Sequence, residues 1–513
     1  MHGPRTAPTS GEPPSDGTSV TLLTEGTYPH SHGGVSVWCD QLINGMPDVD
    51  FHIMAVTGTG REPLSWQPPT HVRGIENLPL WGTPPTCPPP RGRELRRFLG
   101  GYEDFLHALL DPAHEDHFSG ALYQLAALAP SGTLSAALRT ERAARVLARL
   151  WNRPALATAA ARPTLHDALS ATDLLEHALR PLAGRPAATT SVTHAVSGGL
   201  AALPGLVAHH EHGTPFLLTE HGVYLRERYL GFRAEPYRWP VKALMLGFFR
   251  LLAKESYRTA ALVTPGNRYN RRWEEHGGTP PDRIRTVYNG VDPAAFPPAG
   301  PEPETPTLSW AGRVDPIKDL ETLIRAFATV REKLPTARLR LFGGTPRGAE
   351  KYREGCERLA ADLGIGEAVT FEGRVEDIKD AYAAGNVVML SSVSEGFPFT
   401  LIEAMSCGRA TVSTDVGGVR EAVGDAGLVV PPRDPARMAE AALRLLNEPQ
   451  LRARMGEGAR LRVIEQFTLR QTISTFREIY QNLSGHRRDQ RPQRPTGAQR
   501  PSWARAVAAG GAG

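Results

Sequence analysis

The stretch VVMLSSVSEGFPFTLIEAMSCGRATVS, residues 387–413, carries the alternation of elements that decides the fold. Its apolar run at 387–391 predicts a buried strand, the polar residues after it predict a tight turn, and Pro398 suits the first turn of a helix. A second apolar run at 410–413 predicts another strand. Apolar strands joined by helices are typical of a parallel sheet covered on both faces, so this stretch predicts a Rossmann-like α/β domain.

The same alternation continues on both sides of this stretch and recurs near the N-terminus. Further strands of the same domain are predicted at 307–311, 338–342, 368–371 and 428–430. Near the N-terminus, 19–24 and 51–56 predict parallel strands joined by a glycine loop and a helix, and later strands are predicted at 191–195, 215–219, 261–264 and 284–288. The chain is therefore predicted to contain two such domains.

Composition shifts mark the predicted domain boundaries. Residues 60–92 are rich in Pro and Gly and predict a long loop, and 93–185 are rich in Ala, Leu and Arg and predict a helical insertion. The predicted parts are a disordered leader at 1–17, an N-terminal domain at 18–292, a linker at 293–306, a C-terminal domain at 307–467, a helix at 468–483 that could cross back, and a disordered basic tail at 484–513.

Charge and composition exclude several classes of protein. Residues 484–513 hold six arginines and one aspartate, so the remainder of the chain carries 4 − 5 = −1 and does not suit nucleic acid. The sequence has neither an apolar run of about 18 residues nor a signal-peptide core, so we expect a cytoplasmic protein, with peripheral association at the inner face of the membrane left open. The four cysteines form no Cys-x-x-Cys pair and suggest no zinc site.

The strongest chemical signal is the turn and helix that begin at Ser394. A helix that starts near Pro398 presents free N–H groups to an anion. Glu403, inside that helix, could accept hydrogen bonds from a vicinal diol such as a ribose, and Glu395, in the turn, could bind sugar hydroxyls. The alternative is a capped helix with solvated acids.

Two cations follow the first strand of the same domain. Arg313 comes directly after this strand, and Lys318 opens the next helix, so both are expected at the carboxyl edge of the sheet. Together they could neutralise a diphosphate leaving group without a divalent metal. The alternative is a surface ion pair with Asp315 or Asp319.

The first domain contributes candidates from two segments. Gly33 and Gly34 would let the backbone approach a phosphate closely. His221 follows a buried strand, where an imidazole could bond a donor sugar, and His194 is a weaker candidate of the same kind. The polar residues around His221 face either the acceptor, a phosphate or one another; the acceptor-side candidates are Glu220, Arg226 and Arg228.

Together these motifs resemble glycosyltransferase family 4. The resemblance implies the GT-B fold, with two facing Rossmann-like domains and here a helical insertion in the N-terminal one. The first-domain segments around Gly33–Gly34 and 219–228 look like the PelF type of exopolysaccharide glycosyltransferase. This implies a retaining, metal-independent hexosyltransferase that uses a UDP-sugar such as UDP-glucose, a glycan acceptor and a membrane-bound polysaccharide synthesis complex as partner, with no cofactor and no nucleic acid.

The family also implies roles at matching positions. Arg313 and Lys318 would hold the diphosphate, Glu403 the ribose and Glu395 the donor sugar, and His221 would lie by the reacting sugar. The remaining donor contacts would come from Gly33, Gly34, Gly396, Phe397, and the backbone at Arg374 and Val375 near the base. The expected mechanism is front-face attack, in which the departing diphosphate takes the acceptor proton.

Other activities remain open on the sequence alone. A GT-B epimerase would turn over without an acceptor, and a non-catalytic scaffold or sensor would bind the nucleotide sugar without turnover. A dinucleotide-dependent dehydrogenase would need a Gly-x-Gly-x-x-Gly loop with an acidic ribose binder, which this sequence lacks.

Overall fold

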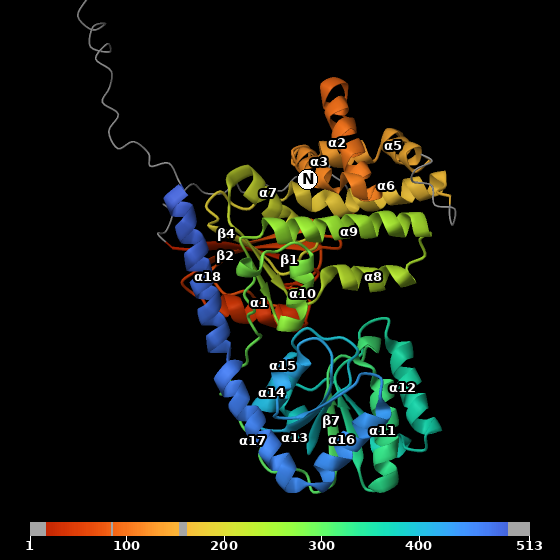
Figure 1. Cartoon of the computed structure of the whole chain (residues 1–513), viewed down its shortest axis with the longest axis vertical. Helices are drawn as coiled ribbons and strands as arrows, with labels where there is room; N and C mark the ends of the chain where they lie inside the picture. Colours follow the sequence, from red (N-terminus) through yellow and green to blue (C-terminus); the bar gives the residue numbers. More distant parts are fainter. Residues whose placement is uncertain (1–16, 84–85, 153–161, 491–513) are drawn as a thin grey trace, which may run out of the picture.

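Two six-stranded sheets, each with all strands parallel, organise the chain (Figure 1). The structure is a computed structural model that describes residues 17–83, 86–152 and 162–490. The first sheet has the order β3-β2-β1-β4-β5-β6 and the second has the order β12-β11-β10-β7-β8-β9. Two stacked α/β domains confirm the predicted fold class.

The first sheet consists of β1 (Ser19–Glu25), β2 (Asp50–Thr57), β3 (Val72–Pro79), β4 (Val192–Ala195), β5 (Phe216–Glu220) and β6 (Leu262–Pro265). The second consists of β7 (Thr307–Ala311), β8 (Arg338–Phe342), β9 (Val369–Gly373), β10 (Val387–Leu390), β11 (Ala410–Thr414) and β12 (Leu428–Val430).

The helices of the first domain are α1 (Gly34–Asn44), α2 (Gly92–Leu110), α3 (Phe118–Ala126), α4 (Thr133–Leu138), α5 (Glu141–Trp151), α6 (Leu165–Leu179), α7 (Ala202–His212), α8 (Tyr224–Ala234), α9 (Trp239–Thr259) and α10 (Arg268–His276). Those that follow are α11 (Leu320–Lys333), α12 (Glu350–Asp362), α13 (Lys379–Ala383), α14 (Phe399–Ser406), α15 (Val419–Val423), α16 (Pro435–Asn447), α17 (Pro449–Gln466) and α18 (Leu469–Gln490).

Helices cover the first sheet on both faces, because successive residues of its buried strands point in opposite directions. Leu22 of β1 packs with Trp38 of α1 and Phe476 of α18. The next residue, Leu23, belongs to the cluster on the other face, which includes Phe248 of α9. Helices α2 to α6 lie between β3 and β4 in the sequence and form a layer over α9 (Figure 1).

The last helix returns to the first domain. Tyr480 of α18 is buried, and its hydroxyl lies 2.7 Å from Nδ1 of His194 at the end of β4. Helix α18 continues to Gln490, so the predicted helix end at 483 and the assignment of 484–490 to a disordered tail are wrong. The arginines at 487 and 488 extend the helical pattern because both have good helix propensity.

Two further expectations fail at the edges of the first sheet. Residues 72–79, predicted as part of a loop, form β3, an edge strand with mostly exposed side chains and therefore no apolar alternation in its sequence. Residues 284–288, predicted as a strand, form an isolated parallel bridge between Ile284 and Val263. The N–H groups of Arg285 and Val287 also donate to the carbonyl oxygens of Val263 and Pro265, so the segment runs beside β6 without forming a regular strand. Val287 is buried in the core of the first domain.

Several predicted features lie outside the described residues. These are nearly all of the leader, positions 153–161 of the insertion and 491–513 of the basic tail. In the described part of the chain, no helix combines the length and apolar character needed to cross a membrane.

Candidate functional site

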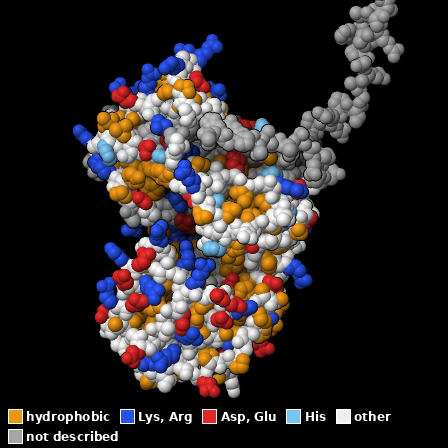
Figure 2. Space-filling model, turned by 180° about the vertical axis from the view of Figure 1, so that it is seen from behind, with side chains coloured by type: hydrophobic (Ala, Val, Ile, Leu, Met, Phe, Trp, Pro, Cys, Tyr) orange, Lys and Arg blue, Asp and Glu red, His pale blue; other side chains and the backbone are white. Residues whose placement is uncertain are grey.

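The N-termini of α1 and α14 face each other where the two domains meet. A Cβ on Gly34, the first residue of α1, would lie 3.7 Å from Cδ2 of Phe399, the first residue of α14. A Cβ on Gly33 would meet nothing within 4 Å. Within the described chain no side chain caps either helix, so both offer free N–H groups to an anion. Figure 2 shows a hollow between the two lobes with basic side chains beside it.

Lys318 and Glu395 form an ion pair on the second domain's side of this junction. Lys318 ends the short helix η4 (Pro316–Lys318) after β7, and Glu395 lies in the turn between β10 and α14. Nζ of Lys318 lies 2.6 Å from Oε1 of Glu395, and the two side chains are only 18 % and 11 % exposed. Oγ of Ser392 donates to the same carboxylate oxygen at 2.6 Å. The two bonds orient Glu395, and the part of the chain that the structure describes places no hydrogen bond on Oε2, which can therefore accept from a ligand.

Arg313 is exposed after the carboxyl end of β7 and has no ion pair with any described residue. Asp315 instead accepts from the backbone N–H of Ile317 at 3.0 Å, and Asp319 caps α11. The alternative of a surface ion pair between these cations and these aspartates is therefore wrong for the described residues.

Glu403 lies on α14 and is held by a buried tyrosine. The hydroxyl of Tyr382 donates to Oε2 of Glu403 at 2.5 Å, and burial raises the pKa of this carboxyl. The described residues place no hydrogen bond on Oε1, which leaves an acceptor for a ligand hydroxyl. Glu403 and Glu395 are thus both placed by α14 and the turn before it.

Arg374 and Val375 directly follow β9, two strands away from β7 in the sheet. Arg374 is exposed and unpaired among the described residues, whereas Val375 packs with the buried Ala311 and Phe342. Because the strands are parallel, the structure places both at the same sheet edge as Arg313.

Glycines bring the turn at 394–398 against the first domain. A Cβ on Gly396 would overlap the carbonyl oxygen of His221, and one on Gly417, where φ is +54°, would overlap that of Glu395. The N–H of Gly418 donates to the carbonyl oxygen of Gly396 at 2.8 Å. Sequence analysis missed Gly417 and Gly418, although a pair of glycines directly after the 410–414 strand is a recognisable turn signal.

Two asparagines of the first domain bind the same turn and were also missed. Nδ2 of Asn267 donates to the carbonyl oxygen of Gly396 at 3.0 Å, and Nδ2 of Asn289 donates to that of Phe397 at 2.8 Å. Both asparagines are buried. The sequence around Asn289, Asn-Gly-Val-Asp, is typical of a turn and does not indicate this contact, and no local signal in the sequence points to the partner of Asn267.

Glu421 of α15 makes a third contact between the domains. Its carboxylate accepts from the backbone N–H groups of Arg268 and Tyr269 at 2.8 and 2.9 Å, at the start of α10. The hydroxyl of Tyr288 donates to it at 3.1 Å. A carboxylate of one domain therefore caps a helix of the other, which stabilises the contact between the two domains.

The two candidate histidines differ in their surroundings. Nδ1 and Nε2 of His194 lie 2.7 Å from the hydroxyls of Tyr480 and Thr219, so both ring nitrogens are engaged in hydrogen bonds inside the protein. Nε2 of His221 is buried without a partner in the described structure, and the ring packs edge-on against Trp38 at 4.7 Å. Burial lowers the pKa of His221 to about 4, so this imidazole is neutral at physiological pH.

The three residues predicted on the acceptor side differ in burial and surroundings. Glu220 is 2 % exposed, accepts from the N–H of Gly198, and has its pKa held well above the ordinary range by burial and the nearby Glu274. It points into the domain, so the prediction of an acceptor contact for Glu220 does not hold. Arg228 lies 4.9 Å from the ring centre of Tyr224, and Arg226 is exposed.

The described residues contain no cluster of three or more His, Cys, Asp or Glu side chains that could hold a metal ion. The cations at this site are protein side chains. Metal independence remains a prediction.

Two family descriptions cover most of the chain. "Domain of unknown function (DUF3492)" matches residues 18–282, and "Glycosyl transferases group 1" matches residues 305–448. The structure is similar to sucrose-phosphate synthase of Thermosynechococcus elongatus (TM-score 0.60, 19 % identity, 91 % of this chain and 100 % of that chain). It is also similar to HepE of Anabaena in complex with UDP (TM-score 0.59, 15 % identity), and the match again covers 91 % of this chain and 100 % of that chain.

Curated relatives share sequence with part of the chain. D-inositol 3-phosphate glycosyltransferase of Frankia alni is 36 % identical over 196 residues, 35 % of this chain and 48 % of that protein. The protein of the same name from Pseudarthrobacter chlorophenolicus is 30 % identical over 303 residues, 55 % of this chain and 69 % of that protein. The chain spans about half the length of the first curated relatives that it matches; for the Frankia alni protein the share is 48 %.

Two facing parallel α/β domains with the site at their junction define a protein of the GT-B class. The chain belongs to the glycosyltransferase group 1 family. The relatives are named D-inositol 3-phosphate glycosyltransferases, and the PelF-type assignment stays a prediction.

Proposed function

We propose that this chain is a retaining glycosyltransferase that moves a hexosyl group from a UDP-sugar, such as UDP-glucose, to a glycan acceptor. The observation that carries the proposal is the Lys318–Glu395 pair beside two facing helix N-termini. A nucleotide diphosphate sugar requires positive charge at its phosphates and acceptor groups at its sugar, and this pair supplies both. HepE of Anabaena, which shares the fold, is known in complex with UDP and with UDP-glucose, and this supports a uridine donor.

The diphosphate would lie between Lys318, Arg313 and the first turn of α14. Arg313 is unpaired among the described residues and can fork to phosphate oxygens, whereas Lys318 acts as a point charge. Gly33 leaves room on the opposite side, where the free N–H groups of α1, which begins at Gly34, add partial positive charge.

The sugar would bind on one side of the phosphates and the nucleoside on the other. Oε2 of Glu395 is free to accept from sugar hydroxyls, next to the backbone of Gly396 and Phe397. The open oxygen of Glu403 would accept from the ribose, with Tyr382 fixing its orientation. The base would lie by Arg374 and Val375, beyond the carboxyl end of β9.

The proposed chemistry is attack on the face from which the diphosphate departs. The bond from the sugar C1 to the phosphate oxygen breaks, the acceptor oxygen bonds to C1, and its proton passes to the departing phosphate. Lys318 and Arg313 stabilise the negative charge that develops on the leaving group. The unpartnered Nε2 of His221, neutral at pH 7, would hydrogen-bond the sugar.

The acceptor and the pathway belong to the same proposal. The likeness of the first domain to the PelF type favours a growing glycan in exopolysaccharide synthesis at a membrane-bound complex. The name of the curated relatives favours D-inositol 3-phosphate as the alternative acceptor.

The test is donor hydrolysis, in which water takes the place of the acceptor. UDP-glucose, ADP-glucose and GDP-glucose are each incubated with the protein in EDTA, and both the released nucleotide and the first anomer of glucose are followed. The proposal predicts slow release of UDP with α-glucose formed first. Addition of D-inositol 3-phosphate or of glucan oligosaccharides then tests the acceptors.

A variant at the proposed site and a control variant away from it test whether this site carries the activity. Lys318→Ala should lower the rate by about 10²-fold or more, because one preorganised charge at the leaving group is lost. Lys333→Ala, an exposed lysine at the end of α11, should leave the rate unchanged. Binding without nucleotide release would indicate a scaffold, and conversion of the sugar within the intact donor would indicate an epimerase; either would contradict the proposal.

A further inference from the structure

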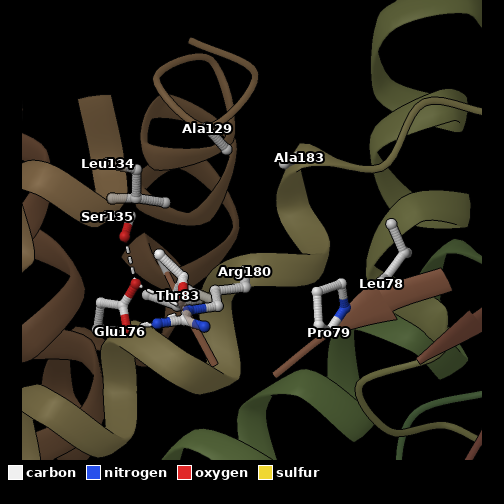
Figure 3. A pocket seen from close by; sticks show the side chains of 10 residues that line it. Leu78, Pro79, Thr83, Ala129, Leu134, Ser135, Glu176, Arg180 and Ala183 are labelled. Carbon is white, nitrogen blue, oxygen red and sulfur yellow. Dashed lines mark hydrogen bonds and ion pairs between the residues drawn. The ribbon is translucent and has the colours of Figure 1, made fainter. Parts of the chain in front are cut away.

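A pocket of about 260 Å³ opens between β3 and the helical insertion (Figure 3). It is formed by the end of β3, α4, α6 and the short helix η2 (Arg180–Ala183). None of its lining residues belongs to the candidate site, whose cations and acids lie on the second domain. Both the strand and the insertion fall within the region of unknown function, residues 18–282.

The pocket has an apolar lining and a buried floor. Its apolar wall consists of Leu78, Pro79, Ala129, Leu134, Leu179 and Ala183. Ala129, Leu134 and Leu179 are buried, whereas Pro79 and Ala183 are exposed and lie at the opening. In Figure 3, Leu134 stands on one side of the space and Leu78 and Pro79 stand on the other.

A neutral ion pair forms the polar side of the pocket. Nε and Nη2 of Arg180 both donate to Glu176 at 2.9 Å, and the Oγ of Ser135 donates to the same carboxylate. The two charged side chains are 10 % and 1 % exposed. Among the described residues, Nη1 of Arg180 makes one hydrogen bond, a long one of 3.4 Å to the carbonyl oxygen of Gly82. Arg180 therefore keeps hydrogen-bond donors, while Glu176 is fully engaged.

The size and chemistry of the pocket define one class of ligand. An apolar cavity of about 150 Å³ holds benzene, so a cavity of this volume has room for a larger hydrocarbon group. Ligand sites generally combine apolar walls with a few converging polar groups, as here. The free N–H groups of Arg180 suit an oxygen acceptor, and the paired Glu176 disfavours a second negative charge beside it.

We propose that this pocket is a binding site for an uncharged, mainly aliphatic ligand that carries one hydroxyl or carbonyl oxygen. The hydrocarbon would fill the space between Leu78 and Leu134, and the oxygen would accept from Nη1 of Arg180. The proposal does not depend on the transferase activity, because the site lies outside the residues assigned to the donor.

The probe is 1-octanol, titrated into the full-length protein and followed by NMR and by calorimetry. We expect saturable one-to-one binding with a Kd of about 1 mM or lower. Octanoate, with a chain of the same length but a negative charge, should bind at least tenfold more weakly. Ala183→Trp fills the opening from an exposed position, where folding is not at risk, and should weaken octanol binding at least tenfold.

Ala188→Trp, an exposed position outside the pocket lining, is the matched control and should bind octanol like the wild type. Absence of saturable octanol binding to the wild type, or equal binding by wild type and Ala183→Trp, would overturn the proposal. UDP binding is measured on the same samples. A protein that binds UDP but not octanol refutes the pocket alone, and the reverse refutes the donor site alone.

Discussion

The side-chain amide of Asn267 donates to the carbonyl oxygen of Gly396 at 3.0 Å and so joins a helix of the first domain to the turn that carries Glu395. The other end of the same amide, Oδ1, accepts from the N–H of Asn270 at 2.7 Å and caps α10. One buried side chain therefore fixes both the start of a helix and the position of the donor-side turn.

Asn267→Asp separates these two functions. Aspartate keeps the oxygen that caps α10 but loses the donor and places a carboxylate beside a carbonyl oxygen, so kcat/KM for the UDP-sugar should fall about 10- to 100-fold. The Tm should change little. A fall in Tm that accounts for the lost activity would show that the contact matters for folding alone.

Gly396→Ala should block closure of the site. The added Cβ would overlap the carbonyl oxygen of His221, so the turn and the first domain could no longer meet. We expect a loss of at least 10²-fold in kcat with the far-UV circular dichroism spectrum unchanged. Gly458→Ala, where the nearest atom would be 3.8 Å away, should retain full activity. Full activity of Gly396→Ala would show that turnover does not need this contact.

Glu421→Ala should weaken closure without touching the donor. Loss of the carboxylate that caps Arg268 and Tyr269 costs about 1 kcal/mol, so KM for the donor should rise roughly fivefold and kcat should change less. Small-angle X-ray scattering should show a larger radius of gyration for the free protein. Glu440→Ala, which removes an exposed ion pair with Arg437, is the control; equal scattering curves for the two variants would reject the role of Glu421.

Glu274 of α10 should make the stability pH-dependent. Burial raises its pKa from 4.5 to about 8; Arg271 opposes this shift, Glu275 adds to it, and Glu220 and Tyr257 also face the group. The folded state holds the proton more tightly, so its stabilisation is complete below pH 4.5 and is lost as the pH rises to about 8.

Glu274→Gln carries no proton to lose. Between pH 5 and 8 its unfolding free energy should therefore fall less steeply than that of the wild type, each unit of pKa shift corresponding to about 1.4 kcal/mol. Urea unfolding at a series of pH values measures this difference. Parallel curves for the two proteins would show that Glu274 is ionised in the folded state.

The sequence predicted the second domain well because its central strands β7, β10 and β11 are buried along their whole length and contain mostly apolar residues. All six of its strands lie at or within two residues of the predicted positions, as at 307–311 and 428–430. The edge strand β3 was missed because exposed side chains leave no apolar pattern to detect. Residues 284–288 do run beside β6, but one bridge and two backbone hydrogen bonds are too few for a regular strand.

Residues of the candidate site could be predicted only where their position depends on a single segment of the sequence. Lys318, Glu395 and Glu403 lie in the segments that come after β7 and β10, and their places at the sheet edge follow from the fold. Asn267, Gly417 and Glu421 act across the domain boundary, so their roles depend on how the domains meet. The prediction of an acceptor contact for Glu220 failed because its polar neighbours in the sequence suggested a surface position. Its side chain instead points inward and accepts from the N–H of Gly198.

The most direct measurement is calorimetric titration of the protein with UDP, ADP and GDP in EDTA, repeated with Arg313→Ala. The account predicts that UDP binds most tightly and that the variant loses at least tenfold in affinity while its Tm is unchanged. Absence of binding by all three nucleotides, or equal UDP affinity in wild type and Arg313→Ala, would contradict the donor site proposed at the junction of the two domains.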